Sequence, residues 1–284
     1  GLESARVEAE RLMCHTFQIS RTDLLLHLNE PVDPAQAGSL ARESARRLAG
    51  IPLQHIEGSV AFRELTLRCD GRALIPRPET EQLVDLIADR VSGPTAGPGV
   101  VRVTRRQAGP SPLGVALDIG TGSGAIALSL VHEGIVEQAV GVDVSEDALA
   151  QAAENRRLAG IDDRVDLRHA EVSPWDAVSA EDRFDLIVSN PPYVRDDEIE
   201  DLAAEVRDHA PRTALAGGAD GLDVVREIAA HARHHLVSDG ALFLEVGDGH
   251  ADAVVALLDA SGPWRSVEIV PDLAGRDRFV IAQA

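Results

Sequence analysis

Lysine is absent from this 284-residue sequence, and all 27 of its basic residues are arginines, against 47 acidic residues. The formal net charge at pH 7 is therefore -20. A protein that binds a nucleic-acid backbone normally carries a basic surface, so this composition argues against nucleic-acid binding. It favours a partner with a basic surface or a small cationic ligand. One short basic patch, Arg102, Arg105 and Arg106, lies in an expected loop and is interpreted as solvated linker.

Cysteine is scarce, and long apolar runs are missing. Cys14 and Cys69 are too few for a disulfide framework or a zinc site, so we expect two small buried residues in a reducing cytoplasm. No run of about 18 apolar residues occurs, and the first residues show no signal-peptide pattern, so we expect no membrane association. His231 and His235 are four residues apart on an expected helix. No third ligand completes a site with them, so we expect a solvated helix face and no metal.

Aromatic residues are also rare, with eight in the chain, and the single tyrosine lies in an unusual setting. Tyr193 ends the stretch Asn190-Pro191-Pro192-Tyr193, directly after the apolar run 184–189, which predicts a buried strand. Each proline restricts its own φ and the residue before it, so this stretch should be a stiff, extended turn. It is either a loop that closes the strand or a binding site, because ligands bind at the carboxyl ends of strands in open α/β sheets. We interpret it as a site whose oxygen acceptors and aromatic wall hold a flat –NH2 group.

The order of expected elements predicts two domains. Residues 1–50 are expected to be helical, with Asp33 as a helix start, and residues 54–70 to form short strands or a hairpin. From residue 115 strands alternate with helices, which is typical of a doubly wound, mostly parallel α/β sheet with both faces covered. We place a small helical domain with its hairpin linker at 1–75 and the sheet domain at 76–284, with a loop or flexible boundary over 92–114.

The expected elements of the sheet domain have the following bounds. The strands are 115–119, 139–143, 165–169, 184–189, 241–246, 267–270 and 279–282, and the helices are 79–90, 124–131, 146–158, 222–236 and 251–258.

A glycine-rich loop joins the first of these strands to its helix, with the sequence Asp118-Ile119-Gly120-Thr121-Gly122-Ser123-Gly124. Glycine lets a backbone turn tightly and approach a ligand closely. The Gly-x-Gly-x-Gly spacing after an acid differs from the dinucleotide pattern Gly-x-Gly-x-x-Gly, and it lacks the lysine of a phosphate-binding loop. Asp118 would repel a pyrophosphate and attract the ammonium group of a methionine moiety, directly or through water. The loop therefore favours S-adenosylmethionine over NAD.

Three further residues lie where a nucleoside needs contacts. Asp143 ends the next expected strand, where a carboxylate accepts hydrogen bonds from both ribose hydroxyls. The alternative is that Asp143 caps the following helix, as Ser145 can also do. Glu171 follows the third strand and is a candidate acceptor for the adenine amino group. Trp175 is a candidate cover for the adenine ring or, alternatively, a core anchor.

Taken together, these motifs resemble those of the HemK/PrmC family of protein-(glutamine-N5) methyltransferases over nearly the whole chain. Two blocks precede the glycine loop, namely residues 50–62 and the more specific Leu74-Ile75-Pro76-Arg77-Pro78-Glu79-Thr80-Glu81. The glycine loop, Asp143 and the 190–193 stretch match the catalytic-domain blocks, and residues 211–222 match a late block. Each block is weak alone, but their order and joint presence are specific.

The resemblance implies a class I methyltransferase sheet of seven strands and a small N-terminal domain that recognises the protein substrate. It also implies transfer of a methyl group from S-adenosylmethionine to the glutamine of the Gly-Gly-Gln loop in class I peptide chain release factors. The residues implied to contact S-adenosylmethionine are Gly120, Thr121, Gly122, Ser123, Gly124, Asp143 and Trp175, to which the residue patterns add Asp118, Glu171 and Asn190. Asn190, Pro191, Pro192 and Tyr193 are implied to hold the substrate glutamine. His250 stands where a glutamine is half-expected, and no role is assigned to it.

The mechanism expected from these residues relies on positioning, because a glutamine amide nitrogen is a poor nucleophile and a methyl-sulfonium is a strong electrophile. We expect the Asn190 side-chain oxygen and the Pro191 carbonyl each to accept one hydrogen of the substrate –NH2, while Tyr193 forms a wall of the pocket.

Other functions remain possible for these motifs. An adenine-N6 or guanine-N2 nucleic-acid methyltransferase also holds a planar –NH2 with such a motif, although the charge disfavours it. A non-catalytic S-adenosylmethionine-binding module and an NAD-dependent oxidoreductase are further alternatives.

Overall fold

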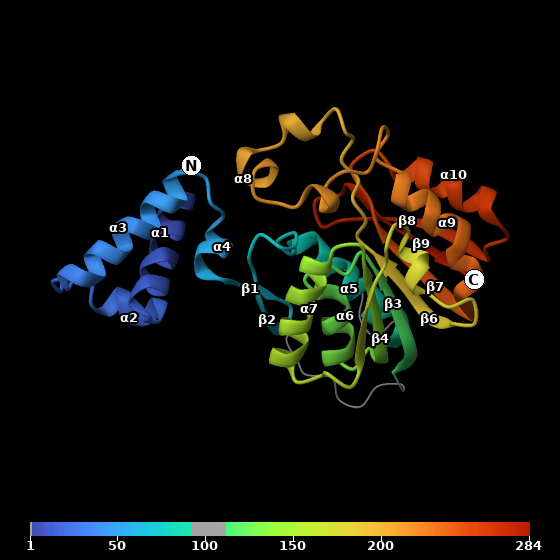
Figure 1. Cartoon of the computed structure of the whole chain (residues 1–284), viewed down its shortest axis with the longest axis horizontal. Coiled ribbons are helices and arrows are strands. Elements are labelled where there is room, and N and C mark those ends of the chain that lie inside the picture. The colour runs from blue at the N-terminus through green and yellow to red at the C-terminus, as the bar shows by residue number, and fades with distance from the viewer. Residues whose placement is uncertain (1, 93–111) are drawn as a thin grey trace.

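The computed structural model describes residues 2–92 and 112–284. A group of N-terminal helices stands beside a larger α/β domain (Figure 1). The expected basic patch at 102–106 and most of the expected 92–114 loop lie outside the described residues. Within the described residues, no helix is long and apolar enough to cross a membrane.

The N-terminal helices begin at residues that suit helix starts. Their bounds are α1 Leu2–Phe17, α2 Arg21–Leu26, α3 Pro34–Leu48 and α4 Leu53–Glu57. Asp33 caps α3 by accepting hydrogen bonds from the backbone N–H groups of Ala35 and Gln36, with proline at the first helical position. The expectation that Asp33 starts a helix is therefore confirmed. Three buried side chains, those of Leu12, Leu53 and Ile56, form the small core of this domain.

Helix α4 corrects the expectation that strands begin at residue 54, since residues 53–57 are helical. Pro52, at the N-cap, has no backbone N–H to leave unpaired, and Gly58 ends the helix in the left-handed region at φ 69°. The apolar spacing alone suits a strand as well as one turn of helix, so these flanking residues decide. The expected hairpin follows at once, with β1 (Ser59–Phe62) antiparallel to β2 (Leu65–Arg68).

The main sheet has seven strands, as expected, and their order is β5-β4-β3-β6-β7-β9-β8. Its strands are β3 Leu113–Ile119, β4 Val136–Asp143, β5 Val165–His169, β6 Phe184–Ser189, β7 Leu236–Glu245, β8 Ser266–Pro271 and β9 Asp277–Gln283. The first five are parallel to one another, and β9 is antiparallel to β7 and β8. This arrangement is a class I methyltransferase fold, which confirms the expected fold class.

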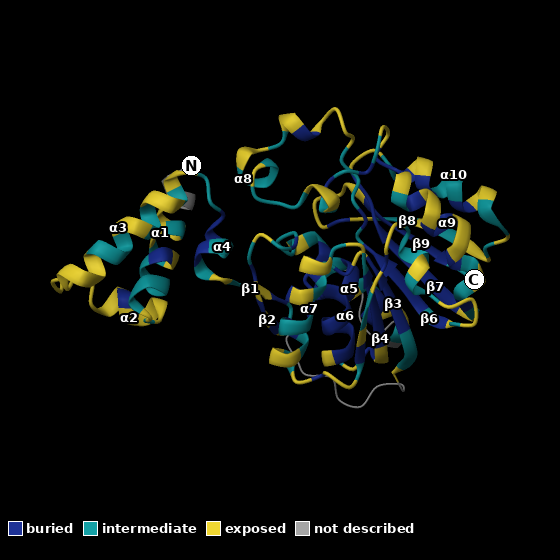
Figure 2. Ribbon diagram, viewed as in Figure 1, coloured by how far each residue is buried: buried dark blue, intermediate teal, exposed yellow. Residues whose placement is uncertain are grey.

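Helices cover both faces of the sheet, and a buried core lies between the sheet and the helices on each face (Figures 1 and 2). These helices are α5 Pro78–Ser92, α6 Ala125–His132, α7 Glu146–Ala159, α9 Asp223–His235 and α10 Ala251–Ser261. The short helix α8, Ala204–Arg207, lies away from the sheet beside the N-terminal helices (Figure 1). Side chains of β3 alternate between the two cores, because successive residues of a strand point to opposite faces. Ala116 packs with α5 and α6, whereas Leu117 and Ile119 pack with α9 and α10.

The hairpin packs against the sheet domain. Phe62, Leu65 and Leu67 are buried in the same core as Leu83 and Ile87 of α5. The hairpin therefore anchors the segment that follows the N-terminal helices to the sheet domain. The expected division at residue 75 stays a prediction.

We expect Phe62→Ala to lower the free energy of unfolding of the sheet domain by about 3–5 kcal/mol, because it empties a fully buried site. Phe62 is 1% exposed. Both tryptophans, Trp175 and Trp264, pack against the sheet core, so their fluorescence during urea denaturation reports on this domain. Leu26→Ala is the control, since Leu26 is 74% exposed, and it should leave the midpoint almost unchanged. Equal midpoints for the two variants would contradict the packing role of the hairpin.

Candidate functional site

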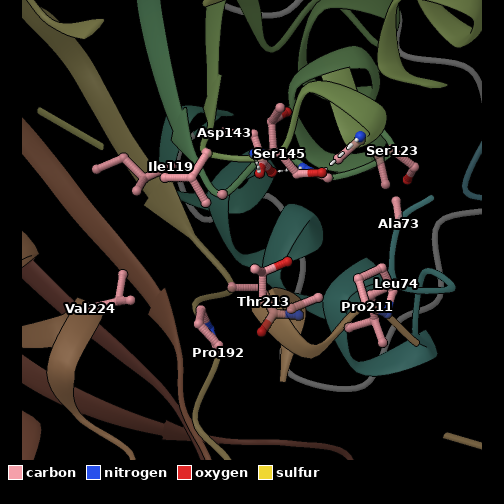
Figure 3. A pocket seen from close by; sticks show the side chains of 18 of the residues that line it. Ala73, Leu74, Ile119, Ser123, Asp143, Ser145, Pro192, Pro211, Thr213 and Val224 are labelled. Carbon is pink, nitrogen blue, oxygen red and sulfur yellow. Dashed lines mark hydrogen bonds between the residues drawn. The ribbon is translucent and has the colours of Figure 1, made fainter. Parts of the chain in front are cut away.

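A cavity of about 250 Å³ opens at the carboxyl ends of β3, β4 and β6. Strand β3 pairs with β4 on one side and with β6 on the other, so the strand order reverses there. Open α/β sheets bind ligands at this kind of switch point. Figure 3 shows Asp143, Ser145 and Ser123 on one side of the cavity. Leu74, Pro211, Thr213 and Pro192 lie across from them.

The glycine-rich loop adopts a conformation that other residues rarely take. Gly120, Gly122 and Gly124 have φ values of 70°, 55° and 83°, all in the left-handed region. A Cβ on Gly124 would lie 2.9 Å from the Leu128 side chain of α6 and 3.3 Å from Ala152 of α7, so only glycine leaves room for these side chains at the start of α6. Apart from its two chain neighbours, no described residue has an atom within 4 Å of a Cβ built on Gly120, which lines the cavity. The backbone there is open to a ligand.

Asp118 lies beneath this loop and is fully buried. Its Oδ2 accepts hydrogen bonds from the Thr121 hydroxyl at 2.7 Å and from the Ala127 backbone N–H at 3.1 Å. Its Oδ1 is buried and has no hydrogen-bond partner among the described residues. Burial raises the pKa of Asp118 to about 7. The carboxyl group thus holds the loop against β3 and α6 from behind the cavity wall. The expected contact with an ammonium group stays a prediction.

Asp143 lines the cavity at the end of β4. Its Oδ2 accepts the Gly122 N–H at 2.8 Å, and its Oδ1 accepts the Ser145 N–H at 2.9 Å. Ser145 caps α7, so the alternative role of Asp143 as the helix cap is not needed. A carboxylate oxygen can accept more than one hydrogen bond, so both oxygens can still receive hydroxyl groups. Burial raises the pKa of Asp143 above its ordinary value.

Asn155 is a residue of this site that the sequence reasoning missed. It lies in α7, and its side-chain oxygen accepts the Arg68 N–H of β2 at 2.7 Å. Its amide donates to the Ser123 carbonyl at 2.9 Å. Asn155 therefore ties the hairpin to the glycine loop. A buried asparagine in the middle of a helix is the signal that could have found it, because such a side chain needs partners.

The expected substrate motif lies on the opposite wall. Asn190 and Pro192 line the cavity, whereas Pro191 and Tyr193 are outside its lining. The Asn190 amide nitrogen donates to the Thr80 hydroxyl at 3.1 Å. The Tyr193 ring is mostly buried, and a side chain on Gly247 would lie 2.9 Å from it. The tyrosine thus supports the motif from behind.

The late glycine block packs against the backbone of this motif. A Cβ on Gly217 would lie 2.7 Å from the Pro192 carbonyl oxygen, and one on Gly221 would collide with the Tyr193 carbonyl oxygen and with the His250 ring. The backbone of Val194 is held on both sides, since its N–H donates to Leu215 O and its carbonyl accepts the Gly217 N–H. Residues 215–221 therefore pack closely against the backbone of the 190–194 turn and restrict its conformation. The His250 ring packs against Gly221 in the same region.

Trp175 and Glu171 lie outside the cavity lining, where Val172 and Pro174 stand instead. The Trp175 indole stacks on His235 with ring centroids 5.0 Å apart, and its N–H donates to the Glu227 carbonyl. This matches the alternative of a packing anchor. The adenine contacts expected of Trp175 and Glu171 stay predictions.

His231 is exposed, as expected for a solvated helix face, whereas His235 is partly buried, and both rings contact Trp175. No group of three His, Cys, Asp or Glu side chains suited to a metal occurs in the described part of the chain.

Other residues of the cavity had no role in the sequence reasoning. The segment 72–77, which connects the hairpin to α5, lines the cavity, and so do Thr213, Val224 and Glu227. The cavity combines backbone N–H groups, apolar walls and the Asp143 carboxylate. This set of groups suits a nucleoside with a ribose diol and a cationic tail, so the residues present fit S-adenosylmethionine.

The buried Asp118 carboxyl group predicts a pH effect on stability. Its folded pKa of about 7 is above the ordinary 3.8, so between these values the folded state holds a proton that the unfolded state has lost. Its contribution to the free energy of unfolding therefore falls as pH rises from 4 to 7, by about 1.4 kcal/mol per pH unit. Asp118→Asn removes this dependence. The stability of the variant relative to wild type should rise with pH and level off above pH 7, as measured by urea denaturation.

The exposed carboxylate Asp239 provides the control for this experiment. Asp239→Asn should follow the wild-type pH profile. Parallel profiles for Asp118→Asn and wild type would contradict the prediction.

Comparisons with known proteins agree with this architecture. The family model described as PrmC N-terminal domain matches residues 1–58, and the one described as Methyltransferase domain matches residues 116–212. A solved structure of a methyltransferase from Pyrococcus furiosus superimposes with a TM-score of 0.54 at 18% identity, and the match covers 86% of this chain and 98% of that chain. This likeness concerns the fold alone.

Curated relatives are much more similar in sequence. A release factor glutamine methyltransferase from Cereibacter sphaeroides is 39% identical over 283 residues, which is 100% of this chain and 92% of the relative. The protein of the same name from Deinococcus radiodurans is 38% identical, with 100% of this chain and 92% of the relative covered. Because the similarity spans both domains, this chain belongs to the release factor glutamine methyltransferase family.

Proposed function

We propose that this protein transfers the methyl group of S-adenosylmethionine to the side-chain amide nitrogen, N5, of the glutamine in the Gly-Gly-Gln loop of class I peptide chain release factors. It would thereby act in translation termination. The observation that carries the proposal is the position of Asn190. Its amide lies on the cavity wall at the end of β6, across from the glycine loop and Asp143.

S-adenosylmethionine supplies an electrophilic methyl group on a positively charged sulfur. Its ribose hydroxyls would be held by Asp143, and its backbone contacts would come from the loop Gly120 to Gly124. Asp118 lies beneath the loop and offers one unpartnered oxygen to the cationic methionine end. The acidic groups of this wall also favour the positively charged donor over its neutral product.

The opposite wall would hold the substrate glutamine. The Asn190 side-chain oxygen and the Pro191 carbonyl oxygen each accept one hydrogen of the substrate –NH2, which fixes the direction of the nitrogen lone pair. The two acceptors also stabilise the positive charge that develops on nitrogen during methyl transfer. Tyr193 keeps the motif rigid from behind. A general base is not required before the attack, because the nitrogen loses its proton only after the new bond forms.

The N-terminal domain would recognise the release factor, because the cavity itself would contact only the side-chain carboxamide of the substrate glutamine. Contacts link this domain to the segment that follows the substrate motif. Arg47 of α3 donates to Glu8 of α1 at 2.7 Å and to Glu205 of α8 at 3.1 Å. His55 of α4 faces His209 edge-on, with ring centroids 6.4 Å apart. These contacts set where a bound protein meets the cavity.

The remaining parts of the proposal concern location and partners. Cys14 and Cys69 are both free, which suits a reducing cytoplasm. The net charge of -20 suits a basic protein surface better than a nucleic acid. We propose that the protein acts in the cytoplasm without direct nucleic-acid binding.

The function is tested with labelled S-adenosylmethionine and release factors that carry Gln or Ala in the Gly-Gly-Gln loop. Label should enter only the protein with Gln, and mass spectrometry should place one methyl group on that side chain. Single-stranded DNA and RNA serve as competing acceptors in the same assay. Label in a nucleic acid, or equal label in the Gln and Ala proteins, would refute the proposal.

The role of Asn190 is tested by Asn190→Ala. We expect methyl transfer to slow by about 10²-fold or more, the scale found when one preorganised polar group is removed from a transition state. The dissociation constant for S-adenosylmethionine should stay close to wild type in calorimetry. Gln138→Ala, which removes an exposed carboxamide near the other end of the sheet, is the matched control and should keep full activity. Near-normal turnover by Asn190→Ala would contradict the assigned role.

A further inference from the structure

Three side chains that are distant in sequence form a chain of hydrogen bonds that runs from the cavity wall into the protein interior. The Asn190 amide nitrogen, at the end of β6, donates to the Thr80 hydroxyl oxygen at 3.1 Å. The Thr80 hydroxyl, in the first turn of α5, donates to Glu245 Oε2, at the end of β7, at 2.8 Å. Thr80 is 5% exposed and Glu245 is 2% exposed. Asn190 and Thr80 both line the cavity, so this chain connects the substrate motif to one group, Glu245, that does not line it.

The donors and acceptors available at each position determine the direction of this chain. An ionised carboxylate can only accept hydrogen bonds, and a threonine hydroxyl has a single proton. When that proton is donated to Glu245, the Thr80 oxygen is left with lone pairs and must receive an N–H. The Asn190 amide therefore turns its nitrogen to Thr80 and its Oδ1 away from it. Within residues 2–92 and 112–284, Asn190 Oδ1 accepts no hydrogen bond, and Asn190 lines the cavity.

We propose that Thr80 and Glu245 are positioning residues that hold the Asn190 amide in the one orientation in which its oxygen faces the methyl-accepting nitrogen. This inference rests on the proposed function. The reverse orientation would place the Asn190 –NH2 against the substrate –NH2, where neither group accepts a hydrogen bond. The 74–81 block contains Thr80 and brings the Thr80 hydroxyl to the end of β6. This position gives the block a structural role in the site.

The charge of Glu245 also acts through this chain. Hydrogen bonds in series polarise one another, so a negative carboxylate behind Thr80 makes the Asn190 oxygen a better acceptor. The effect favours the state in which the substrate nitrogen carries positive charge. Glu245 does not line the cavity, and the hydrogen bonds through Thr80 connect its carboxylate to Asn190.

The ionisation of Glu245 makes this orientation dependent on pH. Burial raises the pKa of Glu245 to about 7, while the Thr80 hydrogen bond and the charges of Arg278 and Arg77 oppose this rise and Glu79 adds to it. Tyr193 is the other titratable group that faces it. Above pH 7 the carboxylate is ionised and the orientation is enforced. Below pH 7 a protonated Glu245 can donate to Thr80, and the Thr80 proton is then free to turn toward Asn190 Oδ1.

The first test replaces Thr80 with valine, which keeps the shape of the side chain and removes its hydroxyl. We expect kcat for methylation of the release factor to fall about tenfold at saturating S-adenosylmethionine, the scale of one lost hydrogen bond. Binding of S-adenosylmethionine, measured by calorimetry, should not change. Thr80→Ser keeps the hydroxyl and should restore most of kcat. Thr66→Val, at an exposed position of β2, is the matched control.

The second test measures kcat as a function of pH in wild type and in Glu245→Gln. This substitution leaves Thr80 unchanged. Wild-type kcat should fall as pH is lowered through about 7. Glu245→Gln should have a low kcat with no such fall. A purely structural role of Glu245 would lower activity without removing the acid limb.

The outcomes separate this inference from the function on which it rests. Wild-type kcat in Thr80→Val, a loss that Thr80→Ser does not restore, or an acid limb that persists in Glu245→Gln would each overturn the positioning role. In those cases a wild-type protein that methylates the release factor leaves the proposed function intact. A wild-type protein that does not methylate the glutamine would overturn both.

Discussion

The parallel pairing of β3 with β4 on one side and with β6 on the other is the constraint on which the rest of the structure depends. It brings the carboxyl ends of three strands to one edge of the sheet. The glycine loop, Asp143 and Asn190 follow those strand ends directly, so they meet around one cavity although up to 72 positions separate them. In the proposed reaction, the methyl donor and the methyl acceptor would thereby contact different walls of the cavity. In the function proposed above, the donor side belongs to β3 and β4, and the acceptor side belongs to β6.

Buried polar side chains then connect this edge to the segments that precede β3, namely the hairpin and α5. Asn155 joins the hairpin to the glycine loop, and Thr80 joins α5 to Asn190 and Glu245. Each of these groups is costly to bury without a partner, so each contact also specifies where its segment must lie. The hairpin and the 72–77 segment are held over the cavity by such contacts and by the apolar side chains of β1 and β2. The substrate motif and the donor loop are thus positioned by the same connecting segment.

Much of the fold could be predicted from sequence because apolar periodicity and flanking residues act locally. The strand at 184–189 and the helix start at Asp33 appear where they were expected. The expectation failed at residues 54–57, where a short apolar pattern suits either element and Pro52 and Gly58 decide for a helix. For Trp175, the sequence left open a ligand contact or a packing role. The stacking on His235 depends on α9, which begins 48 residues later in the chain.

The sequence by itself determined the class of fold, the family and the residues at the strand ends, because these depend on spacing along the chain and on side-chain chemistry. Only the tertiary structure decided which groups work together. It showed that Ser145 caps α7 while Asp143 holds Gly122, and that Thr80 and Glu245 stand behind Asn190. The physical reason is that a hydrogen bond of about 3 Å between residues 110 or 165 positions apart requires both strands and helices to be packed first. No local pattern in the chain encodes that distance.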